Sequence, residues 1–182
     1  ASKVAAVCVT TTSCTVVALD EAGDAVRPAL MWADCRAARE AAEMSALGNW
    51  WVRRVARDVS AEFMVPKALW LKRHEAASWA TATKVCECQD YLNLKCTGVF
   101  VGNSQNVATR WHGDGVRAAE GRDDDWQPWS LLDDLGLAED LGRHKWPRKC
   151  VAMGHTIGAL TTEAKNHLGL PPETAVAVVQ GG

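Results

Sequence analysis

Lys67 is a candidate functional residue, because its charged side chain interrupts the largely apolar stretch Ser60–Lys72. Phe63, Leu69 and Trp70 give that stretch the apolar load of an amphipathic helix that faces a core. A lysine in such a place either snorkels to the surface or points its ammonium group into a pocket. The pattern alone favours the snorkelling lysine.

A second candidate is the polar interruption Thr10–Ser13, which separates two β-rich runs, Lys3–Val9 and Cys14–Leu19. Short hydroxyl side chains and free backbone N–H groups at a strand end suit contact with a ligand. A plain loop or a β-bulge produces the same pattern and is the more common explanation.

Trp32, Asp34 and Arg36 form a third group with polar and aromatic side chains in close sequence. Asp34 is also a good N-cap for a helix that runs to about Leu47. A capping carboxylate beside surface arginines would explain the group without any ligand.

The elements that must position these residues alternate between strands and helices, which predicts an α/β or α+β fold. The opening predicts consecutive antiparallel strands over Lys3–Val9, Cys14–Leu19 and Val26–Trp32. Further along, the pattern predicts helices over Ser60–Glu75, Ala76–Thr83, Gln89–Thr97 (closed by Gly98), Trp129–Leu135, Ala138–Leu141 and Thr161–Leu168. It predicts strands over Lys84–Cys88, Ile157–Leu160 and Thr174–Val179, an extended segment that becomes a loop over Val99–Asn106, an exposed loop over Gly113–Gln127 and a connector over Trp146–Gly154.

Composition excludes several classes of protein. The chain has 182 residues, which fit one domain, and its 48% hydrophobic and 23% charged content is typical of a globular protein. A net charge of -2 without a basic stripe argues against nucleic-acid binding. No apolar run approaches the ~20 residues that span a bilayer.

Seven cysteines at irregular spacings, with one C-x-C pair, argue against a zinc site, a disulfide framework and a redox protein. Free thiols indicate a reducing compartment. We therefore expect a cytoplasmic protein, with an organelle of a eukaryote as the alternative.

Five segments, taken in order, resemble the FGGY carbohydrate kinases, and most of all the ribulokinase-like pentulose kinases. The strongest are a W-x-D-x-R segment at Trp32, an M-x-P-K segment that ends at Lys67, and the Q-D-Y-L-x-L-x-x-T-G segment that ends at Gly98. The other two segments are NVATRWH and the C-terminal run IGALTTEAKNHLGLPPETAVAVVQGG.

This resemblance implies an α/β domain with an actin-like, ribonuclease-H-like fold. Residues 1–182 would form a single N-terminal, sugar-binding domain that is incomplete, without the family's first hairpin and its C-terminal domain. The family's reaction transfers a phosphoryl group from ATP to a sugar hydroxyl, with Mg²⁺ on the phosphates and an aspartate as general base.

The resemblance also implies which residues bind a pentulose-type sugar, such as ribulose or xylulose. Polyol binding needs paired donors and acceptors together with an apolar wall. By position in the family's segments, the expected contacts are Thr11, Thr12, Ser13, Cys14, Trp32, Asp34 and Lys67. The resemblance thus reverses the interpretation of Lys67 from a snorkelling residue to a sugar contact.

Departures from the family pattern leave a second hypothesis open. Thr10 stands where relatives often carry Asp, and the catalytic aspartate of the G-x-D motif would follow Gly182. We expect no catalytic, metal or cofactor residue in this chain, and no activity from it alone. The alternative is an inactive relic that serves as a structural subunit. In either case a partner protein, a second copy or a C-terminal domain would cover the sheet edge at Lys3 and the exposed end of the Thr174–Val179 strand.

Overall fold

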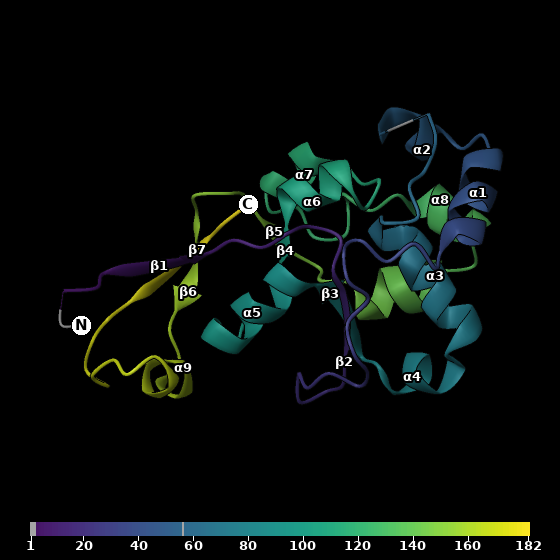
Figure 1. Ribbon diagram of the computed structural model, residues 1–182. Coiled ribbons are helices and arrows are strands. Elements are labelled where there is room, and N and C mark those ends of the chain that lie inside the picture. The colour runs from purple at the N-terminus through teal and green to yellow at the C-terminus, as the bar shows by residue number, and fades with distance from the viewer. Residues whose placement is uncertain (1–2, 56) are drawn as a thin grey trace.

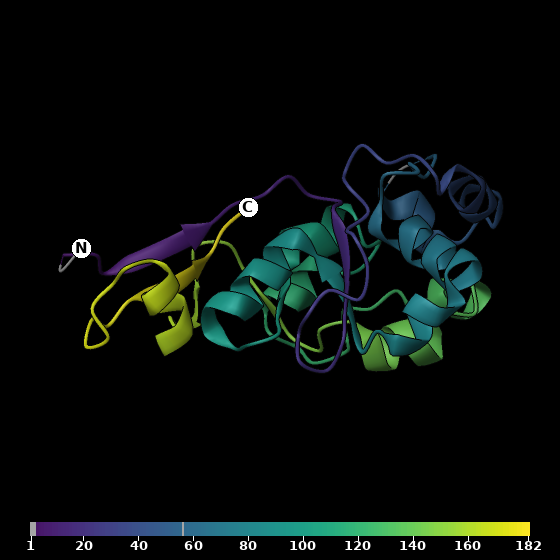
Figure 2. The same ribbon diagram turned by 60° about the horizontal axis from the view of Figure 1, so that its bottom comes forward.

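The computed structural model describes residues 3–55 and 57–182. They form two unequal parts, a narrow wing and a larger helical body, which lie side by side in both ribbon views (Figure 1, Figure 2). The wing consists of strands β1 (Ala6–Val9), β6 (Thr156–Ala159) and β7 (Ala177–Gln180) with helix α9 (Thr162–His167). The body contains everything between β1 and β6.

Two small sheets run through the body. β2 (Val16–Leu19) pairs antiparallel with β3 (Lys84–Glu87), and β4 (Gly102–Asn103) pairs parallel with β5 (Cys150–Val151). The helices around them are α1 (Ala38–Ala46), α2 (Trp50–Val55), α3 (Met64–His74), α4 (Ala76–Thr81), α5 (Cys88–Thr97), α6 (Ser104–Thr109), α7 (Gly115–Ala119), α8 (Trp129–Asp134) and the π-helix η1 (Ala138–Lys145).

The first strand does not pair as the sequence predicts. β1 runs parallel to β7, with Val7 opposite Val178, and β6 pairs antiparallel on the other side of β7. The prediction of consecutive antiparallel strands is therefore wrong for β1 and β2, because β1 finds its partner at the far end of the chain. The predicted strand Val26–Trp32 does not form either, although Val16 and Leu30 exchange antiparallel hydrogen bonds of 2.9 Å as an isolated bridge.

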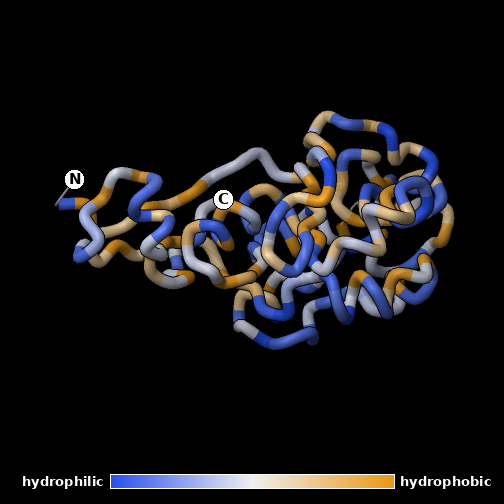
Figure 3. Tube along the Cα trace, turned by 90° about the horizontal axis from the view of Figure 1, so that it is seen from below, coloured by the Kyte–Doolittle hydropathy of each residue, from blue (hydrophilic) through white to orange (hydrophobic). Residues whose placement is uncertain are grey.

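The body holds the main hydrophobic core, in which apolar residues of α3, β2, β3 and η1 pack together (Figure 3). At its centre lie three buried tryptophans, Trp111, Trp126 and Trp146, with ring centroids 5.2–5.8 Å apart. These rings account for part of the unusual tryptophan content of the chain.

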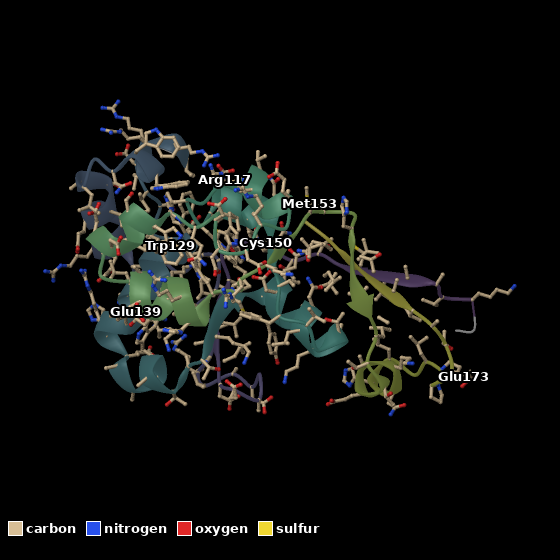
Figure 4. All side chains as sticks on the ribbon, turned by 180° about the vertical axis from the view of Figure 1, so that it is seen from behind. Arg117, Trp129, Glu139, Cys150, Met153 and Glu173 are labelled. Atoms are coloured by element: carbon tan, nitrogen blue, oxygen red, sulfur yellow. The ribbon has the colours of Figure 1, made fainter. Side chains whose placement is uncertain are left out.

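The wing has a much smaller core, formed by Leu160, Ala164, Val176 and Val178. Met153 lies where the wing meets the body and Glu173 lies at the outer end of the wing (Figure 4). Three amide side chains of the body reach across the joint: Gln89 Nε2 donates to Val9 O (3.1 Å), Asn103 Nδ2 to Gly181 O (2.8 Å) and Asn93 Nδ2 to Gln180 Oε1 (3.0 Å).

Gly181, which follows β7, lies directly against the backbone of Val9 at the end of β1. A side chain at Gly181 would collide with the carbonyl oxygen of Val9. The glycine is therefore required by the close approach of two backbones.

Two predicted helix starts are wrong. Asp34 does not cap α1, which begins at Ala38 after the N-cap residue Ala37; instead the Asp34 carboxylate accepts from the backbone N–H of Arg36 at 3.0 Å. Helix α3 begins at Met64 and not at Ser60, because residues 60–63 form a turn closed by a 3.1 Å bond from Phe63 N to Ser60 O.

Three stretches that were predicted to be irregular, wholly or in part, contain ordered elements. In Val99–Asn106 the extended part holds β4, but α6 begins where a loop was predicted, with Asn103 as N-cap accepting from Gln105 N. The predicted exposed loop Gly113–Gln127 contains α7, and Trp126 and Gln127 within it are buried. The connector Trp146–Gly154 supplies β5. Short helices with few periodic apolar residues give a weak sequence signal.

Candidate functional site

A hollow of about 220 Å³ lies where the β1–β2 link meets the turn before α3. Four segments that are far apart in the sequence supply its walls. The lining residues are Thr12, Ser13, Cys14, Trp32, Ser60, Glu62, Phe63 and Arg110. Hydroxyls, a carboxylate and a guanidinium thus face the same space as two aromatic rings.

Cys14, which lines the hollow, has a left-handed backbone with φ of 71°. A residue with a Cβ adopts this conformation at a cost, so neighbouring groups must hold it. Two buried side chains do so: Cys14 N–H donates to Glu87 Oε2 at 2.8 Å, and Cys14 O accepts from Lys67 Nζ at 2.8 Å. The Glu87 carboxylate and the Lys67 ammonium group therefore bind the backbone N–H and the backbone C=O of Cys14, respectively.

Lys67 does not snorkel, because its side chain is fully buried. Its Nζ atom donates to three backbone carbonyls, those of Cys14 (2.8 Å), Met31 (2.7 Å) and Trp32 (3.3 Å). An ammonium group has three N–H donors, so these contacts occupy all of them. Burial lowers the pKa of Lys67 from its ordinary value, and nearby Cys14 and carboxylates partly oppose that shift.

Glu87, at the end of β3, is also fully buried. Besides the Cys14 amide, its oxygens accept from Asn106 Nδ2 at 3.0 Å and from the indole Nε1 of Trp111 at 2.7 Å. Burial raises the pKa of Glu87, and the hydrogen bonds from Trp111 and Cys14 oppose that increase. Glu87 thereby connects the floor of the hollow with α6 and with the tryptophan cluster.

Phe63 and Arg110 form one wall of the hollow. The Arg110 guanidinium carbon lies 5.2 Å from the Phe63 ring centroid, and its Nε donates to Ser13 Oγ at 3.4 Å. Trp32, which is 46% exposed, stands at the rim. The wall therefore offers both an apolar face and hydrogen-bonding groups, which is what the C–H and O–H faces of a sugar require.

His112 packs behind this wall, with its ring centroid 5.7 Å from that of Phe63. It is fully buried with φ of 61°, and neither ring nitrogen has a hydrogen-bond partner within the part of the chain that the structure describes. Burial lowers its pKa to about 4. The ring is thus neutral near pH 7 and acts as packing for Phe63.

The structure brings together four of the seven residues that were predicted to bind sugar: Thr12, Ser13, Cys14 and Trp32 line the hollow. Thr11, Asp34 and Lys67 do not line it. The Asp34 carboxylate pairs with the Arg36 guanidinium at 2.8 Å, and this hydrogen-bonded pairing lowers the pKa of Asp34. A direct contact between Lys67 and a sugar stays a prediction.

Four lining residues were not predicted: Ser60, Glu62, Phe63 and Arg110. Phe63 carries the signal of a core residue, and Ser60 and Glu62 were assigned to a helix that begins only after them. Arg110 is 97 positions from Ser13, so no local pattern connects the two. A larger hollow, of about 570 Å³, is lined mostly by small apolar residues such as Ala38 and Ala41 of α1, with Ser45 and Asp58 as its polar side chains.

Neither metal binding nor membrane insertion finds support in the described ranges. Residues 3–55 and 57–182 contain no group of three or more His, Cys, Asp or Glu side chains placed to hold a metal ion. Among the helices of that part of the chain, none is long and apolar enough to cross a membrane. All seven cysteines are free thiols, of which Cys14, Cys86 and Cys150 are buried.

Comparison with known proteins relates this chain to one family of kinases, both in sequence and in fold. The whole chain, residues 1–182, matches the N-terminal domain of the FGGY family of carbohydrate kinases. It is 32% identical over 175 residues to an FGGY carbohydrate kinase domain-containing protein of Danio rerio and 28% identical over 169 residues to a xylulose kinase of Staphylococcus xylosus. These alignments cover 90% and 92% of this chain but only 31% and 32% of the relatives.

Solved structures agree. A crystal structure titled as a xyloylose kinase from Brucella ovis superimposes with a TM-score of 0.68 at 27% identity, over 92% of this chain and 32% of that one. Xylulose kinase from Rhodospirillum rubrum gives a TM-score of 0.69 at 23% identity, over 98% of this chain and 34% of that chain. The predicted actin-like α/β fold is confirmed, and the chain spans about a third of the length of the relatives it matches.

Proposed function

The chain belongs to the FGGY family of carbohydrate kinases, and we propose that it forms the sugar-binding region of an ATP-dependent pentulose kinase. The reaction would transfer a phosphoryl group to a hydroxyl of a ribulose- or xylulose-type sugar. The observation that carries the proposal is the hollow in which Thr12, Ser13 and Trp32, all predicted from sequence, meet Phe63 and Arg110.

The size and chemistry of the hollow fit a monosaccharide. Its volume of about 220 Å³ lies below the roughly 300 Å³ at which pockets for drug-sized ligands begin. Ser13 and Thr12 offer hydroxyls that both donate and accept, Glu62 accepts, and Arg110 donates. Trp32 and Phe63 supply apolar surface for the C–H groups of a sugar ring or chain.

Kinases of this family use ATP with Mg²⁺, and the lining of the hollow suits neither of them. The described residues hold no cluster of carboxylates or imidazoles for a divalent cation. The wall residues of the hollow suit a neutral polyol better than a triphosphate, because Arg110 is the one cation among the described residues that lines it. We therefore assign sugar binding to this chain and no step of nucleotide chemistry.

The test is ATP-dependent phosphorylation by the protein expressed from its complete reading frame. ADP release with xylulose and ribulose, compared with aldopentoses as controls, should show turnover that Ser13→Ala lowers by about threefold to tenfold in kcat/KM through the loss of one hydrogen bond. Turnover that is unaffected by Ser13→Ala and Arg110→Ala would contradict the assignment of the hollow.

The same assay separates the alternative function, an inactive relic that serves as a structural subunit. β1 has a strand partner on one side only within the described residues, so its outer edge could pair with another chain. Pentulose binding without turnover, together with a fixed partner protein in the purified sample, would support the relic.

A further inference from the structure

The strained backbone at Cys14 and the two buried charges beside it form one unit. Cys14 has a φ of 71°, its N–H donates to Glu87 and its carbonyl accepts from Lys67, both at 2.8 Å. Lys67 and Glu87 come from two different elements, α3 and β3. Neither side chain is exposed to solvent or lines the hollow.

Burying an ammonium group and a carboxylate costs more stability than burying apolar residues of the same size. The cost is reduced only when each charge has good hydrogen-bond partners, and here all the bonds from Lys67 go to backbone carbonyls of residues 14, 31 and 32. Those carbonyls belong to the two loops that supply Ser13, Cys14 and Trp32 to the hollow. The arrangement therefore fixes these loops relative to each other.

Building on the function proposed above, we propose that Lys67 and Glu87 are positioning residues that hold Cys14 in its left-handed conformation and so shape the floor of the sugar hollow. Lys67 acts through the backbone and does not touch the sugar. We call the two side chains, with their hydrogen bonds to the backbone of Cys14, the brace. Without it, Cys14 would relax to a negative φ, and the hydroxyl of the preceding Ser13 would turn away from Arg110.

The first test measures the backbone at residue 14 by NMR, from chemical shifts and scalar couplings. The brace predicts a positive φ in the wild-type protein and a shift to negative φ in Lys67→Met. Lys72→Met, which removes a lysine of the same helix that contacts Gly136 and Asp140, serves as the matched control and should leave φ positive. A positive φ that persists in Lys67→Met would overturn the proposal.

The second test is a double-mutant cycle on pentulose affinity. Glycine adopts positive φ freely, so in a Cys14→Gly background the brace is no longer needed. Lys67→Met should weaken binding about tenfold when residue 14 is Cys, the factor that the left-handed conformation costs a residue with a Cβ. In the Cys14→Gly background the loss should fall below about threefold, a coupling that only interacting residues show. An equal loss in both backgrounds would show that Lys67 affects binding by a route other than the backbone of Cys14, and would overturn the proposal.

The proposal can still be tested if Lys67→Met does not fold or if the protein binds no pentulose. If Lys67→Met does not fold, Glu87→Gln enters the same cycle, since its amide can no longer accept all three bonds that the carboxylate accepts. If the wild-type protein binds no pentulose, the proposed function fails, and the NMR measurement at residue 14 still decides whether the brace exists.

Discussion

The hollow and the joint between body and wing rest on buried polar side chains of different kinds. Beside the hollow, the body buries charged residues, Lys67 and Glu87, whereas the joint is made by neutral amides of the body such as Asn93 and Asn103. A neutral amide needs only hydrogen bonds to be buried at little cost, but a charge also loses its hydration. The contrast indicates that the charges beside the hollow lower the stability of the body but fix the geometry of the hollow. The amides at the joint only align β1 and β7 with the body.

The tryptophan cluster offers the sharpest way to test the charged side of this comparison. Trp111→Phe leaves a buried Glu87 oxygen without its donor and opens a cavity, each costing about 2 kcal/mol, so the free energy of unfolding should fall by about 4 kcal/mol. Trp146→Phe is the matched control, because its indole N–H has no partner among the described residues. It should cost about 2 kcal/mol or less, as measured by urea denaturation. Equal losses would show that the bond to Glu87 contributes little.

His112 predicts an acid sensitivity that belongs to the body alone. Its pKa is about 4 in the folded protein, against about 6.5 when unfolded, so the unfolded chain binds the proton first. The stability that this histidine contributes is present above about pH 6.5 and is lost as the pH falls toward 4, by about 3 kcal/mol. His112→Phe should remove that loss, and, since both nitrogens lack partners among the described residues, it should not destabilise the protein at pH 7. An unchanged pH profile in His112→Phe would refute this assignment.

The neutral joint is tested by Asn103→Ala. The substitution removes the bond to Gly181 O and the N-cap of α6, and should cost about 2 kcal/mol in total. Hydrogen exchange should quicken in β1 and β7 and at the start of α6, while amides of β2 and β3 keep their protection. If β2 and β3 also lose protection, the wing and the body unfold as one unit and the comparison fails.

The smallest effect is expected at Asp34. Its carboxylate is tied to the half-exposed Arg36, and exposed ion pairs are worth little. Asp34→Ala should change the free energy of unfolding by less than about 0.5 kcal/mol. It should also leave pentulose affinity within about twofold, since Asp34 does not line the hollow. A loss of tenfold or more in affinity would restore Asp34 as a sugar contact.

Local patterns allowed most elements to be predicted. Helix α5 ends at Gly98 with φ of 72°, as the sequence predicts. Thr161 caps α9 through its hydroxyl, which accepts from Ala164 N at 3.1 Å. These features depend on residues within one helix, so the sequence displays them directly.

Features that depend on distant residues could not be predicted from patterns. β1 pairs with β7 from the opposite end of the chain, so its partner could not be inferred from neighbours in sequence. The burial of Lys67 depends on carbonyls 35 to 53 positions away, and any side chain can stand at those positions because only their backbone is used. The segment resemblance found Ser13 and Trp32, but Arg110 joins them only through the fold.

The most direct test of the central claim is an NMR titration of the isotope-labelled protein with xylulose, with ribulose in parallel. We expect saturable shifts at the backbone amides of Thr12, Ser13 and Cys14 and at the indole N–H of Trp32, with no shifts in β6 or α9. Saturable shifts confined to the wing, or none at any sugar concentration, would contradict the assignment of the hollow as the sugar site.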